Sequence, residues 1–275
     1  MNSTSCDIKI KLKEMFAWFH AFCEENGLRY YMVGGTMLGS YRHGGFIPWD
    51  DDIDVGMPRA DYERLEEILK DGSEDKRYVL ETPNTNANDY FYAFSKLYDT
   101  STTLIENTRY KIKRGIYIDI FPLDGIGNTR EEAEKNYSKV YKLHNLLLTR
   151  VVGIRRGRKW YKNLAVAAAR AVPNFILNNK KLLLRFVGLC KKYDFDECEW
   201  GGNLVGAWRF KEIMPRDIMG EPTLYNFEGL RVYGPEKPDE YLTYLYGDWR
   251  KLPPIEKQVT HHDYILCDLN SSYID

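Results

Sequence analysis

The feature that most restricts how this chain can fold is a run of four aspartates within five residues: Asp50, Asp51, Asp52 and Asp54. Like charges this close repel one another, so the run needs a physical reason. The string "DIDVGM" alternates between acidic and apolar residues like a strand. If the alternation extends back to the start of the run, Asp50, Asp52 and Asp54 share one face, and Asp51 lies on the other face with the apolar residues. Carboxylates gathered on a partly buried strand call for a cation, and oxygen ligands favour Mg²⁺ or Mn²⁺. The alternative is a solvated acidic turn in which the first two aspartates act as caps.

A pair of glycines precedes the acidic run and follows a short apolar strand expected for "RYYMV". The glycines stand at the start of a turn and short helix, "GTMLGSYR", where backbone N–H groups and the helix dipole favour a phosphate. Nearby hydroxyls and a guanidinium add donors. Taken singly, the glycines are more simply interpreted as turn residues and the polar residues as surface side chains. No Walker A or GxGxxG pattern is present. Their order predicts a phosphate-binding loop made of Gly34, Gly35, Thr36, Ser40 and Arg42.

A third carboxylate is expected on a neighbouring strand, because two bridged metal ions need more oxygen ligands than two aspartates supply. The segment "GIYIDIFPLDG" offers Asp119, which alternation separates from Ile118 and Ile120. A lone acid within an apolar strand is costly to bury without a partner. Asp124 lies beyond this strand and is more simply a turn former.

The remaining pattern predicts an α+β fold, a small mixed sheet flanked by helices. An amphipathic helix is expected over residues 8–26 with Gly27 as its cap, another helix follows Pro58, and "YVLET", "FYAFSKLY" and "STTLIE" are further strands. A helical region follows, and then a hairpin, "EPTLYNFEGLRVYG", and a helix within "KPDEYLTYLYGDWRKLPP". We divide the chain into a catalytic core, a basic helical region and a C-terminal segment that packs back on the core: residues 1–128, 129–200 and 201–275.

Charge is segregated along the chain. Residues 135–193 contain fifteen Lys or Arg and no Asp or Glu, although the net charge of the whole chain is −1. Such a segment favours an anionic partner such as a membrane surface or an anionic glycan, and a solvated basic face is the equal alternative. An interfacial amphipathic helix is one interpretation of its apolar residues, but helices that pack into a core are commoner.

No apolar run is long enough to span a membrane, and the N-terminus lacks a signal-peptide pattern. Five cysteines without a CxxC pair indicate neither a disulfide framework nor a zinc site. We therefore expect a cytoplasmic protein, with peripheral contact at the inner face of the cytoplasmic membrane through residues 135–193 as a further expectation.

The order of these motifs resembles the LicD family. The resemblance is carried by the glycine pair, "IPWDDDIDV" and the later "IDIFPLDG", and "YLTYLYGDWRKLPP" followed by His261 and His262 resembles the closing segment of that family. It covers most of the chain, while the helical middle matches only in general character. The resemblance implies a polymerase-β-type nucleotidyltransferase fold, related to fukutin-type proteins.

The resemblance also implies roles for individual residues. Lys96, within "FSKLY", becomes a candidate, together with Arg42, for binding the negative charge of the phosphate. Without the resemblance, Lys96 is more simply interpreted as a lysine on an edge strand. The implied metal ligands and catalytic residues are Asp52, Asp54 and Asp119, the last as a third ligand or a base.

The implied reaction is metal-dependent transfer of phosphocholine from CDP-choline to a hydroxyl of a cell-surface glycan, such as lipopolysaccharide or teichoic acid, or of its lipid-linked precursor. CMP is released, and no nucleic acid takes part. The alternatives are a ribitol phosphate or aminoethylphosphonate head group, nucleotidyl transfer, and a non-catalytic protein that binds glycan or membrane. Aromatic rings would hold a quaternary ammonium, but with 21 Tyr and 6 Trp the sequence does not single out which.

Overall fold

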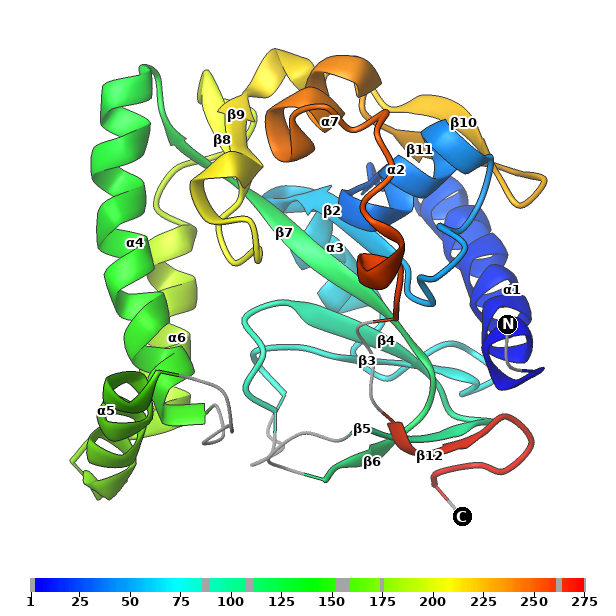
Figure 1. Ribbon diagram of the computed structural model, residues 1–275, viewed down its shortest axis with the longest axis horizontal. Helices are drawn as coiled ribbons and strands as arrows, with labels where there is room; N and C mark the ends of the chain where they lie inside the picture. Colours follow the sequence, from blue (N-terminus) through cyan, green and yellow to red (C-terminus); the bar gives the residue numbers. More distant parts are fainter. Residues whose placement is uncertain are drawn as a thin grey trace.

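A mixed sheet forms the centre of this computed structural model, which describes residues 3–85, 90–106, 111–151, 159–173, 176–260 and 264–274 (Figure 1). The strands of its main path lie in the order β1-β2-β7-β4-β3, and β8 pairs with both β7 and β9. Strands β2 and β7 are parallel, and the other pairs are antiparallel. The bounds are β1 Tyr31–Met32, β2 Asp54–Pro58, β3 Tyr78–Glu81, β4 Ser95–Asp99, β7 Tyr117–Gly127, β8 Trp200–Asn203 and β9 Ile213–Pro215.

One face of this sheet is apolar and packs into the main core. Val55 in β2, Leu97 in β4 and Ile118 in β7 are fully buried there. Helix α1 (Ser3–Asn26) supplies an apolar stripe to the same core and ends at Gly27, whose φ of 57° a side chain rarely adopts. Helices α2 (Gly34–His43) and α3 (Arg59–Ile68) follow β1 and β2. The α+β fold expected from the sequence is confirmed.

Several local predictions need correction. Helix α2 begins at Gly34 itself, without a preceding turn. The acidic run precedes β2, which begins only at Asp54. Strand β7 continues past Asp124, because β8 pairs with its second half, so the turn-former interpretation of Asp124 is wrong. The edge-strand interpretation of Lys96 is also wrong, since β4 lies between β7 and β3.

The basic region forms three helices around a second core: α4 (Arg130–Val151), α5 (Trp160–Ala171) and α6 (Asn179–Cys190). Figure 1 shows α4 extending away from the sheet, with α5 at its far end. Tyr137 and Leu147 of α4 pack in the same cluster as Leu183 and Phe186 of α6. The preference for core helices over interfacial ones is therefore confirmed for α6.

The C-terminal segment returns to the first part of the chain. The predicted hairpin is present as β10 (Thr223–Phe227) and β11 (Leu230–Gly234), and the predicted helix as α7 (Pro238–Tyr246). A separate small sheet, which the sequence did not predict, joins β12 (Tyr264–Asp268) to β5 (Thr103–Glu106), and β5 to β6 (Lys113–Arg114). Short 3₁₀ turns lie at Arg209–Glu212, Arg216–Ile218 and Ile255–Lys257. None of the helices in the described ranges is both long and apolar enough to cross a bilayer.

Candidate active site

A row of charged residues crosses the central sheet. Glu81 in β3 stands opposite Lys96 in β4, and Lys96 stands opposite Asp119 in β7. Asp119 is in turn the register partner of Asp54 in β2. Residues paired in this way share one face, and their chain neighbours point to the apolar face. The sheet thus brings together two of the proposed catalytic residues, Asp54 and Asp119, and the proposed phosphate-binding residue Lys96.

Lys96 is a buried cation between an acid and aromatic rings. Its side chain is 4% exposed, and its Nζ lies 2.8 Å from Oδ1 of Asp119. The same Nζ lies 3.4 Å from the ring centroid of Tyr117 and 4.7 Å from that of Tyr92. Burial lowers the pKa of a lysine, but the neighbouring acidic groups, Asp119 first, outweigh burial and raise the pKa of Lys96. The side chain is therefore a fixed positive charge beside Asp119.

Asp54 faces an excess of negative charge. Burial raises its pKa well above the ordinary range, and the charges of Asp52, Asp119 and Asp50 raise it further. Lys96 acts in the opposite direction but does not restore the ordinary value. A carboxyl group in this setting binds a proton unless a further cation offsets its neighbours. The electrostatics of the row therefore favour a cation in addition to Lys96.

The acidic run is not a strand, and Asp51 and Asp52, which the alternation placed on opposite faces, both line one small cavity. Asp51 is buried and accepts a hydrogen bond from Thr260 Oγ1 at 3.0 Å. Asp50 and Asp52 instead act on Asp54. Three of the four carboxylates thus belong to one electrostatic cluster, and Asp51 fastens the run to the C-terminal segment.

The glycine pair brings the start of α2 against the carboxylates. A Cβ at Gly35 would lie 3.0 Å from Oδ2 of Asp50, and one at Gly34 would lie 3.5 Å from Oδ2 of Asp54. Gly34 also has a φ of 55° and donates its N–H to the hydroxyl of Tyr241 at 2.8 Å. The first N–H groups of a helix have no partner within the helix, and the helix dipole there favours an anion. The phosphate-binding role of the two glycines stays a prediction, and the Gly34 N–H is already used by the hydroxyl of Tyr241.

The other predicted phosphate ligands contact protein groups. Thr36 Oγ1 accepts a hydrogen bond from the backbone N–H of Asp54 at 2.8 Å, which ties α2 to β2. Ser40 Oγ donates to the carbonyl of Asn226 at 2.8 Å. Arg42 Nη1 donates to the carbonyl of Trp249 at 2.7 Å. These contacts hold the C-terminal segment and the acidic run in place, and the phosphate-binding role of the three residues stays a prediction.

Two features of the site were missed or left open by the sequence. Tyr241, already noted at Gly34, is buried, and Tyr246 lies near the same glycine. Arg59 of α3 and Asp124 of β7 form a two-fold hydrogen-bonded ion pair, at 2.8 and 2.7 Å. Nothing in the local pattern distinguishes these tyrosines from the many others. His261 and His262, which completed the family-like closing segment, lie outside the described residues.

The donors of this site suit a hard divalent cation. Asp52, Asp54 and Asp119 offer only oxygen ligands, as Mg²⁺ and Mn²⁺ prefer. Across the described ranges, no three acidic, histidine or cysteine side chains form a ready-made metal cage. Mg²⁺ commonly binds through one or two carboxylates together with substrate phosphates and water, so an open arrangement of carboxylates is compatible with it.

Comparison with known proteins agrees with this arrangement. A family model described as "LicD/FKTN/FKRP, nucleotidyltransferase domain" matches residues 27–147, which include the glycine pair, the acidic run and β7. The lipopolysaccharide cholinephosphotransferase LicD of Haemophilus influenzae is 30% identical over 250 residues, which cover 89% of this chain and 91% of that protein. The human ribitol 5-phosphate transferase FKRP is 39% identical over 57 residues, covering 21% of this chain and 12% of that protein. Because the Haemophilus protein matches over nearly its full length, the chain belongs to the LicD family and is a phosphotransferase.

Proposed function

We propose that the chain transfers phosphocholine from CDP-choline to a hydroxyl of a cell-surface glycan or its lipid-linked precursor and releases CMP. The observation that carries the proposal is the site around Asp54, where an excess of carboxylates and the N-terminus of α2 meet. Such a place suits a cation and a phosphate together. The names of the Haemophilus and human relatives support a transferred phosphoryl group that carries a small alcohol.

The reaction would use residues of this chain in defined roles. Asp119 accepts the proton of the acceptor hydroxyl, whose oxygen then forms a bond to the phosphorus that carries choline. The bond from that phosphorus to the bridging oxygen breaks, and CMP leaves with the bonding electrons. Lys96, fixed 2.8 Å from Asp119, stabilises negative charge near the transferred group. Mg²⁺ or Mn²⁺ held by Asp52, Asp54 and Asp119 would neutralise charge on the carboxylates and phosphates.

The test is release of CMP with Mg²⁺ from a panel of donors: CDP-choline, CDP-ribitol, CDP-ethanolamine, CDP-glycerol and CMP-aminoethylphosphonate, with a glycan extract as acceptor. We expect CMP from CDP-choline, with choline appearing on the glycan, and at least a hundredfold less with Asp52→Asn. Ser101→Ala, an exposed change away from the row, is the matched control. Release of pyrophosphate from CTP in place of CMP would show nucleotidyl transfer, and undiminished turnover by the folded Asp52→Asn variant would refute the assignment of this residue.

We further propose that α5 lies on an anionic membrane surface, where a lipid-linked acceptor would be found. Trp160 and Leu164 in this helix are 75% and 60% exposed, and Ile176 beyond it is 65% exposed. Exposed aromatic and aliphatic side chains next to basic residues are typical of helices that lie in a membrane interface. Not every basic residue of the region is available for this, because Arg150 is buried and donates to backbone carbonyls at the end of α5.

A further inference from the structure

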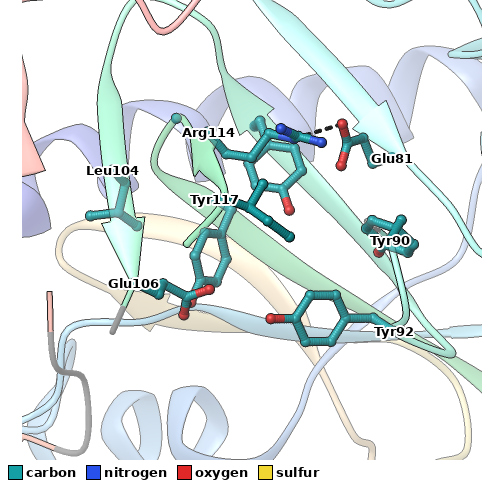
Figure 2. A pocket seen from close by; sticks show the side chains of 10 residues that line it. Glu81, Tyr90, Tyr92, Leu104, Glu106, Arg114 and Tyr117 are labelled. Carbon is teal, nitrogen blue, oxygen red and sulfur yellow. Dashed lines mark hydrogen bonds and ion pairs between the residues drawn. The ribbon is translucent and has the colours of Figure 1, made fainter. Parts of the chain in front are cut away.

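A cavity lined by tyrosines lies between the central sheet and the small sheet of β5 and β6. About 410 Å³ of empty space lies among its side chains, a figure that includes open solvent. Figure 2 shows acidic, basic and aromatic side chains arranged around it. The lining includes four tyrosines and two glutamates: Tyr90, Tyr92, Tyr98, Tyr117, Glu81 and Glu106.

The cavity adjoins the row of charged residues. Tyr117 precedes Asp119 by two residues on β7, so both side chains belong to the same face of the sheet. The rings of Tyr117 and Tyr92, which line the cavity, are also the rings in contact with Lys96 Nζ. Lys96 in turn contacts Asp119. Lys96 and these two rings therefore lie between Asp119 and the cavity.

The two carboxylates of the cavity differ in their partners. Glu81 accepts a hydrogen bond from Arg114 Nε at 2.7 Å, an ion pair marked in Figure 2. Glu106 accepts a hydrogen bond from the hydroxyl of Tyr117 at 2.7 Å, and Tyr92 points toward it. No lysine, arginine or histidine of the described part of the chain forms an ion pair with Glu106. The cavity thus combines aromatic faces with the carboxylate of Glu106, whose charge also acts on the nearby Lys96.

The tyrosines of the cavity act as neutral rings and donors. Burial raises the pKa of Tyr98 and Tyr90 well above the ordinary value, so their hydroxyls stay protonated at neutral pH. A neutral ring presents a negative face to a cation, and each such contact is favourable when water is excluded. An anionic group would instead face Glu106 and the ring faces, which repel it, while Arg114 in the same lining is already paired with Glu81.

We propose that this cavity binds the positively charged head group of the donor, a quaternary ammonium or protonated amine, and that Glu106 with Tyr92 selects it over neutral alcohols of similar shape. The inference rests on the proposed function, because it names the part of the donor that the cavity receives. It assigns selectivity to residues outside the row of Asp54, Asp119 and Lys96. A neutral head group such as a polyol would leave the Glu106 carboxylate without the charge that it attracts.

The experiment compares two donors of nearly the same shape: CDP-choline and the CDP ester of 3,3-dimethylbutanol, in which carbon replaces the charged nitrogen. Glu106→Gln keeps an oxygen that can accept from Tyr117 but removes the charge. Tyr92→Leu removes a ring, and Tyr92→Phe is its matched control, since it keeps the ring. Kinetics for both donors are combined with calorimetric binding of phosphocholine, which needs no turnover, and with thermal unfolding of each variant.

We expect Glu106→Gln to raise KM for CDP-choline and the Kd for phosphocholine at least tenfold, with less than a twofold change in KM for the neutral donor. Tyr92→Leu should raise KM for CDP-choline and the Kd for phosphocholine by a similar factor, and Tyr92→Phe should raise them by less than threefold. Equal effects on the two donors, or none in folded variants, would overturn the inference while the proposed function stands. Binding of phosphocholine that depends on Glu106, without CMP release from any donor, would support the cavity and contradict the proposed function. Absence of both binding and turnover would contradict both.

Discussion

Replacing Lys96 by methionine tests the electrostatic account of the site most directly. The side chains of Lys96 and Asp119 are 4% and 16% exposed, and their charged atoms lie 2.8 Å apart. Methionine keeps much of the length and apolar volume of the lysine but none of its charge. Asp119 is then left with Asp54 and Asp52 as its charged neighbours, and all three repel one another.

The size of the effect follows from the geometry. At an effective dielectric constant of about 20, two unit charges 2.8 Å apart attract by roughly 6 kcal/mol. Desolvation of the lysine offsets part of this, and removing one partner of a buried ion pair usually costs about 3–5 kcal/mol. We therefore expect Lys96→Met to lower the free energy of unfolding at pH 7 by about 3 kcal/mol, a large part of the roughly 5–15 kcal/mol typical of a domain.

The assay is urea unfolding followed by tryptophan fluorescence, for the wild type, Lys96→Met, Asp119→Asn and the double variant. Because the double variant removes both charges, its loss should be smaller than the sum of the single losses by at least 1 kcal/mol. Mg²⁺ should recover more stability in Lys96→Met than in the double variant, which lacks one of the proposed ligands. A loss below about 1 kcal/mol in Lys96→Met, or additive losses within about 0.5 kcal/mol, would refute the reasoning.

Three further predictions address the rest of the fold. Arg59→Met should lower the free energy of unfolding by about 3–5 kcal/mol, measured by urea unfolding, because it leaves the carboxylate of Asp124, whose side chain is 1% exposed, without its cation. Burial lowers the pKa of His144 to about 4. The unfolded chain therefore binds more protons than the folded one between about pH 4 and 6.5, so the free energy of unfolding should fall by roughly 1–2 kcal/mol from pH 7 to pH 5. His144→Phe should remove this loss, as measured by thermal unfolding at a series of pH values. Trp160→Glu should reduce sedimentation with vesicles rich in phosphatidylglycerol at least fivefold without changing thermal stability, since this side chain is 75% exposed.

Each of these has a matched control. Arg64→Met removes an arginine from the same helix as Arg59, but its side chain is 57% exposed, so a similar loss there would contradict the role given to burial. Ile255→Glu changes an equally exposed apolar residue outside the basic region and should leave vesicle binding intact. For His144, an unchanged pH dependence in the phenylalanine variant would show that other groups titrate in this range.

The site was predictable from the sequence where the chemistry depends on local alternation. Period-two patterning assigned Asp119 and Ile118 to opposite faces of one strand, and the structure places them so. The same rule does not separate Asp51 from Asp52, because the run precedes the strand and both side chains line one small cavity. Local rules suffice at Asp119 because β7 is extended there and each side chain alternates with the next.

Predictions failed where the answer depends on which distant strand lies alongside. Lys96 resembled an edge lysine because nothing near it in sequence shows that β3 and β7 flank β4. Asp124 resembled a turn residue because β8, which extends the pairing of β7, comes some 75 residues later in the chain. The tyrosines of the cavity could not be selected either, since they come together only when β5 and β6 form a sheet beside β4 and β7. Register between distant segments is set by the whole core and not by the local pattern.

The hydrogen bond from Gly34 to Tyr241 also bears on how the enzyme matures during translation. The two residues are 207 positions apart in the chain. At synthesis rates of about 5–20 residues per second, the glycine loop emerges roughly 10–40 s before the tyrosine that fixes its first N–H. Contacts across such long separations form late and close large loops. In a nascent chain the aspartates and the glycine pair would therefore be present before the site is complete. Activity would begin only after α7 has been made and has docked.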